Sequence, residues 1–280
     1  MKEKDILIWD RLWPAFKLKG TGTKEFLNGK TTLNILKLDE EIISKSCLLD
    51  RNGKLKAILE FKLYNDYALI IVISGDFKEI YNLFESVIFP ADNVQISLEK
   101  KIRRLETLYL GGMFHGQDIL WLEDNECIPS FDFNFKFADF YQVEEWRIKG
   151  GIYLSDDELK MASNPYELGL SEYISMNKGC YLGQESMARI IKSGFTRQQL
   201  RYWEYKGKIS GNKILNHPTD KSDDVLGSIT YSVYFPESDF SMGYALVKKK
   251  ALNQKELLIC DFGRTIKIYT PFAFKQIKSA

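Results

Sequence analysis

The sequence predicts an α+β protein that ends in a separate β module. The chain has 280 residues, 45% of them hydrophobic, which is enough to bury one large core or two to three smaller ones. In the N-terminal part, segments that alternate like strands are interleaved with segments of helical periodicity. Beyond Phe195 the helical periodicity stops, and short segments rich in β-forming residues follow one another.

The N-terminal part begins with an expected strand and an expected helix. Residues 15–19 alternate in polarity like a strand, and the glycines within residues 20–23 interrupt it. Residues 24–28 then favour a short helix, for which Thr23 is the expected N-cap.

A hairpin and an amphipathic helix are expected next. Residues 55–63 keep an apolar period of two, and residues 68–73 are wholly apolar, so both segments predict strands. The polar residues 65–66 between them favour a hairpin turn. Residues 77–88 place their large apolar side chains on one helical face, and Pro90 ends this helix.

Four phenylalanines alternate with polar residues over residues 131–137. This spacing predicts a strand with one aromatic face. Such a face can stack nucleic-acid bases, but half of a sheet's side chains have to pack somewhere. We therefore interpret it as part of a core.

The C-terminal part predicts a small closed or sandwiched β domain. Its β-rich segments are separated by Gly, Asn, Asp or Pro, at the spacing typical of such domains. The predicted strands lie at residues 200–205, 225–234, 241–247, 257–260 and 265–269.

The charge balance argues against strong binding to nucleic acid or to an anionic membrane. The 39 basic and 38 acidic residues give a net charge of +1. The longest apolar run, residues 68–73, is far shorter than the roughly 20 residues that span a bilayer. Residues 1–5 resemble neither a signal peptide nor a transit peptide, so a cytoplasmic protein is expected.

The cysteines do not predict a metal site. Cys47, Cys127, Cys180 and Cys260 are widely scattered, and no two of them form a C-x-x-C pair. A zinc or an iron–sulfur centre held within the chain requires closely spaced ligands. We interpret three of the four as inert small hydrophobes, and Cys180 as the exception to examine.

Cys180 lies in the stretch SMNKGCYLGQESMARI, between Gly179 and Gly183 and ahead of a helix expected over residues 184–192. The nearby helix N-terminus and Lys178 both favour a thiolate. The opposite interpretation is a small buried residue beside an ordinary Glu185–Arg189 surface pair. The residues alone leave both interpretations open.

The stretch KGCYLGQE, followed by Ala188-Arg189-Ile190, resembles the K-G-C-[FY]-x-G-Q-E signature of the YgfZ family. That family is the folate-binding branch of the fold shared with the glycine cleavage T-protein, an aminomethyltransferase. Further similar segments lie at residues 16–32, 48–54, 145–151, 164–170, 226–230 and 242–246.

The resemblance implies a three-module α+β fold around a central folate channel. It implies a first module of residues 1–48 plus 138–195, a second of residues 49–137, and a C-terminal β-barrel of residues 196–280. The implied cofactor is tetrahydrofolate or a derivative. The implied roles are catalytic for Cys180 and Lys178 and folate-binding for Gly179, Tyr181, Gly183, Gln184, Glu185, Arg189 and Arg147, the last toward the glutamate tail.

The resemblance further implies an accessory protein that supports assembly or repair of iron–sulfur clusters in client enzymes, such as those that methylthiolate tRNA. Its partners would be a folate and the clients or assembly proteins, with no direct contact to nucleic acid or membrane. The client proteins, the folate form, the oligomeric state and any catalytic turnover are left open.

A tetrahydrofolate-dependent one-carbon transferase is the alternative. The T-protein has an acidic pair after its glycine turn, whereas residues 53–58 here contain no carboxylate. Lys149 stands where the T-protein holds the pterin with a glutamate, and a lysine cannot accept the pterin's N–H bonds. A cysteine hydrolase is disfavoured, because neither His115 nor His217 lies in a recognisable motif.

Overall fold

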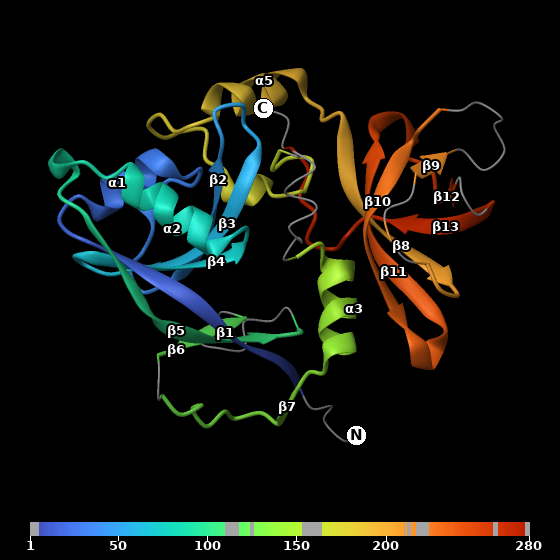
Figure 1. Ribbon diagram of the computed structural model, residues 1–280, viewed down its shortest axis with the longest axis horizontal. Coiled ribbons are helices and arrows are strands. Elements are labelled where there is room, and N and C mark those ends of the chain that lie inside the picture. Colours follow the sequence, from blue (N-terminus) through green and yellow to red (C-terminus); the bar gives the residue numbers. More distant parts are fainter. Residues whose placement is uncertain are drawn as a thin grey trace. The chain divides into compact units, whose positions relative to one another are not determined.

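The computed structural model describes residues 6–109, 118–123, 126–152, 164–209, 211, 214–216, 224–259 and 263–277. Its contacts divide the chain into two compact units (Figure 1). Unit 1 comprises Met1–Leu48, Ala57–Val143 and Asn177–Leu182, and unit 2 comprises Leu49–Lys56, Glu144–Met176 and Gly183–Ala280. The division into three modules remains a prediction.

Unit 1 is built on a seven-stranded sheet in the order β2-β3-β4-β1-β5-β6, with β7 paired to β1. The strands are β1 (Ile6–Lys19), β2 (Ile43–Leu49), β3 (Leu55–Leu63), β4 (Tyr67–Ser74), β5 (Gln95–Thr107), β6 (Ile119–Leu122) and β7 (Phe135–Phe137).

β1 is the central strand, and it is longer than the five residues that the sequence predicted. It pairs antiparallel with β4 and β5 and parallel with β7. Its register against β5 shifts between Trp13 and Ala15, on either side of Pro14. A proline has no N–H to donate to a ladder, which explains an irregularity at this point.

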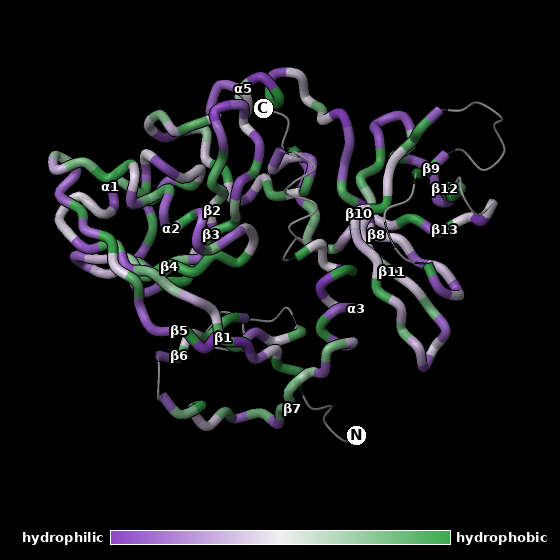
Figure 2. The backbone as a smooth tube through the Cα atoms, viewed as in Figure 1, coloured by the Kyte–Doolittle hydropathy of each residue, from purple (hydrophilic) through white to green (hydrophobic). Residues whose placement is uncertain are grey.

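The predicted hairpin is confirmed, because β3 and β4 pair antiparallel with Leu63 opposite Ala68. Both strands carry buried apolar side chains, and Figure 2 shows the hydrophobic run along β4. One face of the sheet packs with α1 (Thr23–Lys30) and α2 (Phe77–Ser86) in a core that contains Phe16, Phe61 and Phe84.

The helix caps differ from the sequence-based expectation. Thr23 is the first residue of α1 rather than its N-cap, and the capping residue Gly22 makes no side-chain hydrogen bond. The stronger cap belongs to α2, where the side chain of Asp76 accepts a 2.7 Å bond from the backbone N–H of Glu79. The helix α2 ends at Ser86, before the predicted residue 88, and Pro90 is the first residue of a separate 3-10 turn, Pro90–Asp92.

Unit 1 also buries a network of charged side chains. Arg104 forms a two-pronged pair with Glu60, at 2.7 and 2.9 Å, and a 2.7 Å bond to Glu106. The indole N–H of Trp121 donates to Glu60 at 2.8 Å, and the Lys45 ammonium lies 3.7 Å from it. Glu60 and Arg104 are at most 1% exposed. Burial acts to raise the pKa of Glu60, but these donors outweigh it and hold the pKa below its usual range.

The interpretation of the aromatic stripe at residues 131–137 as core holds only in part. Phe131, Phe133 and Phe135 are partly buried and pack at the margin of a small core cluster around Ile8. Only the last three residues form a strand, and Phe137 at its end is exposed.

Unit 2 contains the expected C-terminal β-barrel, closed in the order β10-β11-β8-β13-β12-β9. The strands are β8 (Gln198–Lys206), β9 (Ile214–Asn216), β10 (Gly227–Phe235), β11 (Phe240–Lys248), β12 (Glu256–Ile259) and β13 (Arg264–Tyr269). The sequence predicted all of these except β9, which is too short to show a period. Trp203 fills the barrel, and its indole N–H donates to the carbonyl of Tyr244 at 3.1 Å. The predicted α+β fold with a C-terminal barrel is confirmed.

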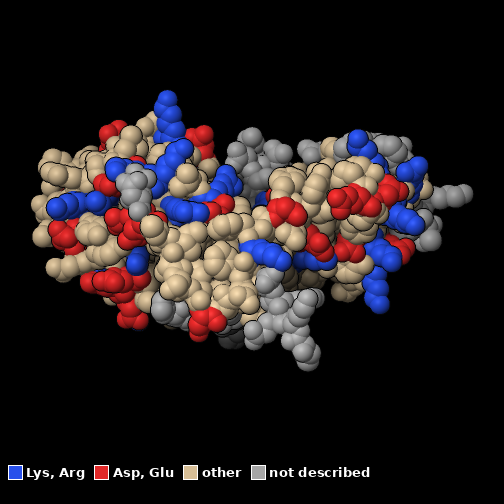
Figure 3. All heavy atoms as spheres, turned by 90° about the horizontal axis from the view of Figure 1, so that it is seen from below, with Lys and Arg blue, Asp and Glu red and all other residues tan. Residues whose placement is uncertain are grey.

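The described part of unit 2 also contains the second part of α3 (Phe140–Gly150), the helix α5 (Gln184–Ser193), and short 3-10 turns at Ser171–Tyr173, Pro236–Ser238 and Lys249–Ala251. The helix expected over residues 184–192 is therefore confirmed. No helix in the described part of the chain is both long and apolar enough to cross a membrane. Acidic and basic side chains are interspersed on the face shown in Figure 3, in keeping with the net charge of +1.

We expect Arg104→Met to lower the free energy of unfolding by about 3–5 kcal/mol, because it leaves Glu60 buried without its main partner. Urea denaturation followed by circular dichroism measures this. The matched control is Lys24→Met, which removes the exposed Lys24–Glu40 pair and should cost under about 1 kcal/mol. Equal small losses in both variants would contradict a stabilising role for the network.

Candidate functional site

The loop that carries the signature is anchored to unit 1 by Lys178. Its ammonium group donates to the backbone carbonyls of Asn28, Thr31 and Leu33, at 2.5, 2.7 and 2.7 Å. These carbonyls lie at and just beyond the C-terminus of α1, where helix carbonyls lack partners within the helix. A lysine at a helix C-terminus also complements the helix dipole. The loop is thereby fixed to the end of α1.

Burial lowers the pKa of Lys178 to about 8. The three carbonyl dipoles favour the charged form and so oppose this shift. The same ammonium lies 5.1 Å from the ring centre of Tyr181, which is itself buried. These contacts make Lys178 and Tyr181 parts of the loop's anchor. An electrostatic effect of Lys178 on the thiol of Cys180 remains a prediction.

Cys180 is exposed, in contrast to a cysteine used for packing. Cys47 is such a packing residue: it is fully buried, and burial raises the pKa of its thiol to about 12. The interpretation of three cysteines as inert hydrophobes is wrong for Cys127, which is also exposed. Cys260, His115 and His217 lie outside the described residues. Two exposed thiols in the described chain are therefore open to chemistry.

The helical half of the signature enters unit 2 at Gly183, which packs against a tight turn. Gly183 has a φ of +83°, and a Cβ there would lie 2.7 Å from the carbonyl oxygen of Asp50 and 3.0 Å from the Cα of Gly53. The Asp50 carboxylate accepts from the backbone N–H groups of Asn52 and Lys54, at 2.8 and 2.9 Å. This turn belongs to residues 48–54, one of the segments that resemble the family. A Cβ at Gly53 would lie 2.6 Å from the Cβ of Ser186, so the close contact requires glycine on both sides.

Gly179 shows no such constraint. Its φ is not positive, and the nearest atom to an added Cβ would be the side-chain nitrogen of Asn28, 4.0 Å away. The two signature glycines thus differ: Gly183 is required by backbone conformation and packing, and Gly179 by neither.

The remaining predicted residues of α5 lie on its surface. Glu185 and Arg189 form an i,i+4 pair at 3.7 Å, with side chains 91% and 81% exposed, so their mutual attraction is weak. Gln184 is partly exposed at the first turn of the helix. These side chains are accessible from solvent, and their folate-binding roles remain predictions.

Arg147 is held in a cluster of hydrogen-bonded and aromatic side chains in unit 2. Its guanidinium donates twice to Glu144, at 3.1 and 2.8 Å, and lies 4.9 Å from the ring centre of Tyr231. The hydroxyl of Tyr231 donates to Glu144 at 2.7 Å, and that of Tyr244 to the carbonyl of Arg147 at 2.7 Å. Arg147 is 8% exposed. The cluster ties α3 to β10 and β11, and the predicted contact of Arg147 with a glutamate tail remains untested.

We expect Gly183→Ala to destabilise the protein by about 1–3 kcal/mol, because alanine is strained at positive φ and its Cβ would clash with Asp50. Gly179→Ala is the matched control and should change stability by no more than about 0.5 kcal/mol. Denaturant unfolding of both variants checks this. Equal effects at the two positions would overturn the assignment.

The known proteins that resemble this chain include an aminomethyltransferase and two proteins named tRNA-modifying protein YgfZ. No family model matches the chain. An aminomethyltransferase of Caldanaerobacter subterraneus is 21% identical in an alignment that covers 86% of this chain and 77% of that protein. The tRNA-modifying protein YgfZ of Aliivibrio fischeri is 24% identical, over 67% of each chain. The YgfZ protein of Sodalis glossinidius is 26% identical, over 76% of this chain and 73% of that protein.

The solved structures include a glycine cleavage system aminomethyltransferase T from Bartonella henselae. It superposes with a TM-score of 0.73 at 12% identity, and the match covers 98% of this chain and 88% of that one. An identity this low speaks for the fold alone. Taken with the signature KGCYLGQE, these findings confirm the predicted resemblance to the YgfZ family and a fold related to that of the aminomethyltransferases.

Proposed function

We propose that this chain is a folate-binding accessory protein for tRNA modification, and that it supports assembly or repair of iron–sulfur clusters in cytoplasmic client enzymes. The observation that carries the proposal is the exposed thiol of Cys180 on a loop anchored through Lys178. Two relatives that bear the name tRNA-modifying protein support the same assignment.

The setting of Cys180 suits a thiol that meets a partner. The anchor fixes Lys178, two positions before Cys180. The loop is therefore already ordered, and little conformational entropy is lost when a partner binds the thiol. An exposed sulfur can reach a cluster, a partner thiol or an electrophile, as a buried one such as Cys47 cannot. Which of these three groups meets the thiol depends on the chemistry of the client enzyme.

The folate part of the proposal rests on the resemblance and on accessible groups. Tetrahydrofolate, when bound, supplies a carrier of one-carbon groups. Arg189 is the exposed cation among the predicted binding residues, and guanidinium groups pair well with the carboxylates of a glutamate tail. Arg147 already holds the carboxylate of Glu144, so Arg189 suits the tail better.

The transferase alternative is less well supported by the same structure. Strand β3 follows the glycine turn, and its one carboxylate, Glu60, is buried in the two-pronged pair with Arg104. A carboxylate in that state is not free to act on a substrate amine. Lys149 is paired with Glu145 at 2.5 Å on the surface of α3. A turnover assay with tetrahydrofolate and aminomethylated donors distinguishes the two functions.

We expect Cys180→Ser to abolish the support of iron–sulfur enzyme activity, because the hydroxyl is a poor nucleophile and a poor ligand for iron. The measurement is the methylthiolation of tRNA in cells that lack the protein and express the variant. Cys127→Ser is the matched control, since it removes the other exposed thiol of the described chain, and it should restore activity fully. Full restoration by Cys180→Ser would refute a thiol role.

We expect folinic acid and tetrahydrofolate to bind saturably and to change the fluorescence of the five tryptophans. Cys180→Ser should retain this binding, because the thiol is assigned to the client and not to the folate. Arg189→Gln should weaken it by about tenfold if the guanidinium holds a carboxylate. A titration without any saturable change would remove the folate from the proposal and leave the cysteine assignment standing.

A further inference from the structure

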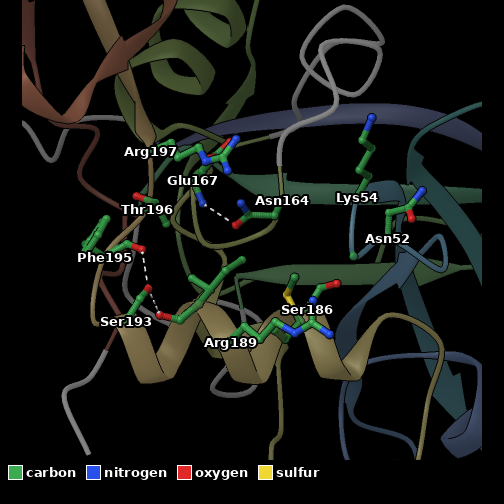
Figure 4. A pocket seen from close by; sticks show the side chains of 13 residues that line it. Asn52, Lys54, Asn164, Glu167, Ser186, Arg189, Ser193, Phe195, Thr196 and Arg197 are labelled. Carbon is green, nitrogen blue, oxygen red and sulfur yellow. Dashed lines mark hydrogen bonds between the residues drawn. The ribbon is translucent and has the colours of Figure 1, made fainter.

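Unit 2 contains a pocket of about 560 Å³ beside α5, here called the α5 pocket. In Figure 4, Ser186 and Arg189 extend from the helix, while Asn164, Glu167 and Arg197 lie across from it. The turn that carries Lys54 supplies a third wall. The volume is that of a site for a small molecule.

The charges of the α5 pocket are predominantly positive. Lys54, Arg189 and Arg197 line it from three separate segments, against the single carboxylate of Glu167. All three basic residues are exposed, so their head groups can turn toward a ligand. Guanidinium groups bind carboxylate and phosphate groups with two parallel hydrogen bonds. Two arginines from different segments therefore favour a ligand with more than one acidic group.

Two of the polar residues that line the pocket, Thr196 and Glu167, are buried. This distinguishes the pocket from an ordinary patch of exposed charges. Thr196 lines it and is 4% exposed, and its hydroxyl has no hydrogen-bond partner in the part of the chain that the structure describes. Leaving a buried hydroxyl unsatisfied is unfavourable, and a polar ligand atom can satisfy it. Glu167 is 6% exposed, and its carboxylate accepts from the Gln198 amide at 3.2 Å.

The carboxyl group of Glu167 further restricts which ligands fit the α5 pocket. Burial raises the pKa of its carboxyl group, which opposes the lowering by its hydrogen bonds and by Arg197. A carboxyl group in a pocket wall accepts hydrogen bonds, and it repels an anion that offers none. The ligand should therefore combine acidic groups with an N–H or O–H donor.

We propose that the α5 pocket binds a small polyanion that carries at least two phosphate or carboxylate groups together with a hydrogen-bond donor. Arg189 and Arg197 bind the acidic groups, Glu167 accepts from the donor, and the hydroxyl of Thr196 bonds a ligand oxygen. The role of Arg189 rests on the proposed function, which gives the same guanidinium to the glutamate tail of the folate. The roles of Arg197, Glu167 and Thr196 belong to this site alone.

The test is isothermal titration of the full-length protein with two probes that share this chemistry. Adenosine diphosphate represents the phosphates, and the tripeptide triglutamate represents the carboxylates. Saturable binding of either probe is expected, weakened about tenfold in Arg197→Gln and reduced at high salt. Lys192→Gln is the matched control, since Lys192 is an exposed lysine of α5 outside the pocket, and it should bind as the parent does.

Thr196→Val separates a binding role from a structural one, because it replaces only the hydroxyl by a methyl group of similar size. The free variant should melt at the same temperature as the parent or higher, since a buried unsatisfied group is gone. Its affinity for the probe should nevertheless fall about threefold or more. The probe that binds identifies the acidic group. Failure of both probes to bind at millimolar concentration, or equal affinity in the parent, Arg197→Gln and Thr196→Val, would overturn the proposal.

Discussion

The loop around Cys180 depends on one half-buried cation. The ammonium of Lys178 is bound by three carbonyls at and just beyond the C-terminus of α1. Past the thiol, the chain enters unit 2 at Gly183, whose missing side chain lets it rest on the turn at Asp50. Within unit 1, the exposed cysteine follows the anchored lysine by two positions. The thiol is therefore close to a fixed point of the backbone without being buried.

The sequence predicted the fold class, the hairpin of β3 and β4, and five of the six barrel strands, because each has a clear period or turn. The sequence also separated Cys180, which is exposed, from Cys47, which is a buried packing residue. It did not predict that Cys127 is exposed, since a lone cysteine has no local pattern that reports burial.

The features that the sequence missed are contacts between distant residues. Lys178 and Thr31 are separated by 147 positions, and Glu60 and Arg104 by 44, so no local pattern could join either pair. Asn164, Glu167 and Arg197 meet at one pocket only because the 164–167 turn and the start of the barrel come together. Thr23 was misjudged for a different reason: Gly22 can begin a helix without a side-chain cap.

The position of β1 in its sheet bears on how the protein folds. The strand pairs with β4 and β5, and its parallel neighbour β7 ends at Phe137, far along the chain. Pairings across such long stretches of chain close slowly. The edge of β1 that pairs with β7 therefore stays unpaired on a nascent chain until more than a hundred further residues have been made. Such an edge is a site for mispairing or for a chaperone during synthesis.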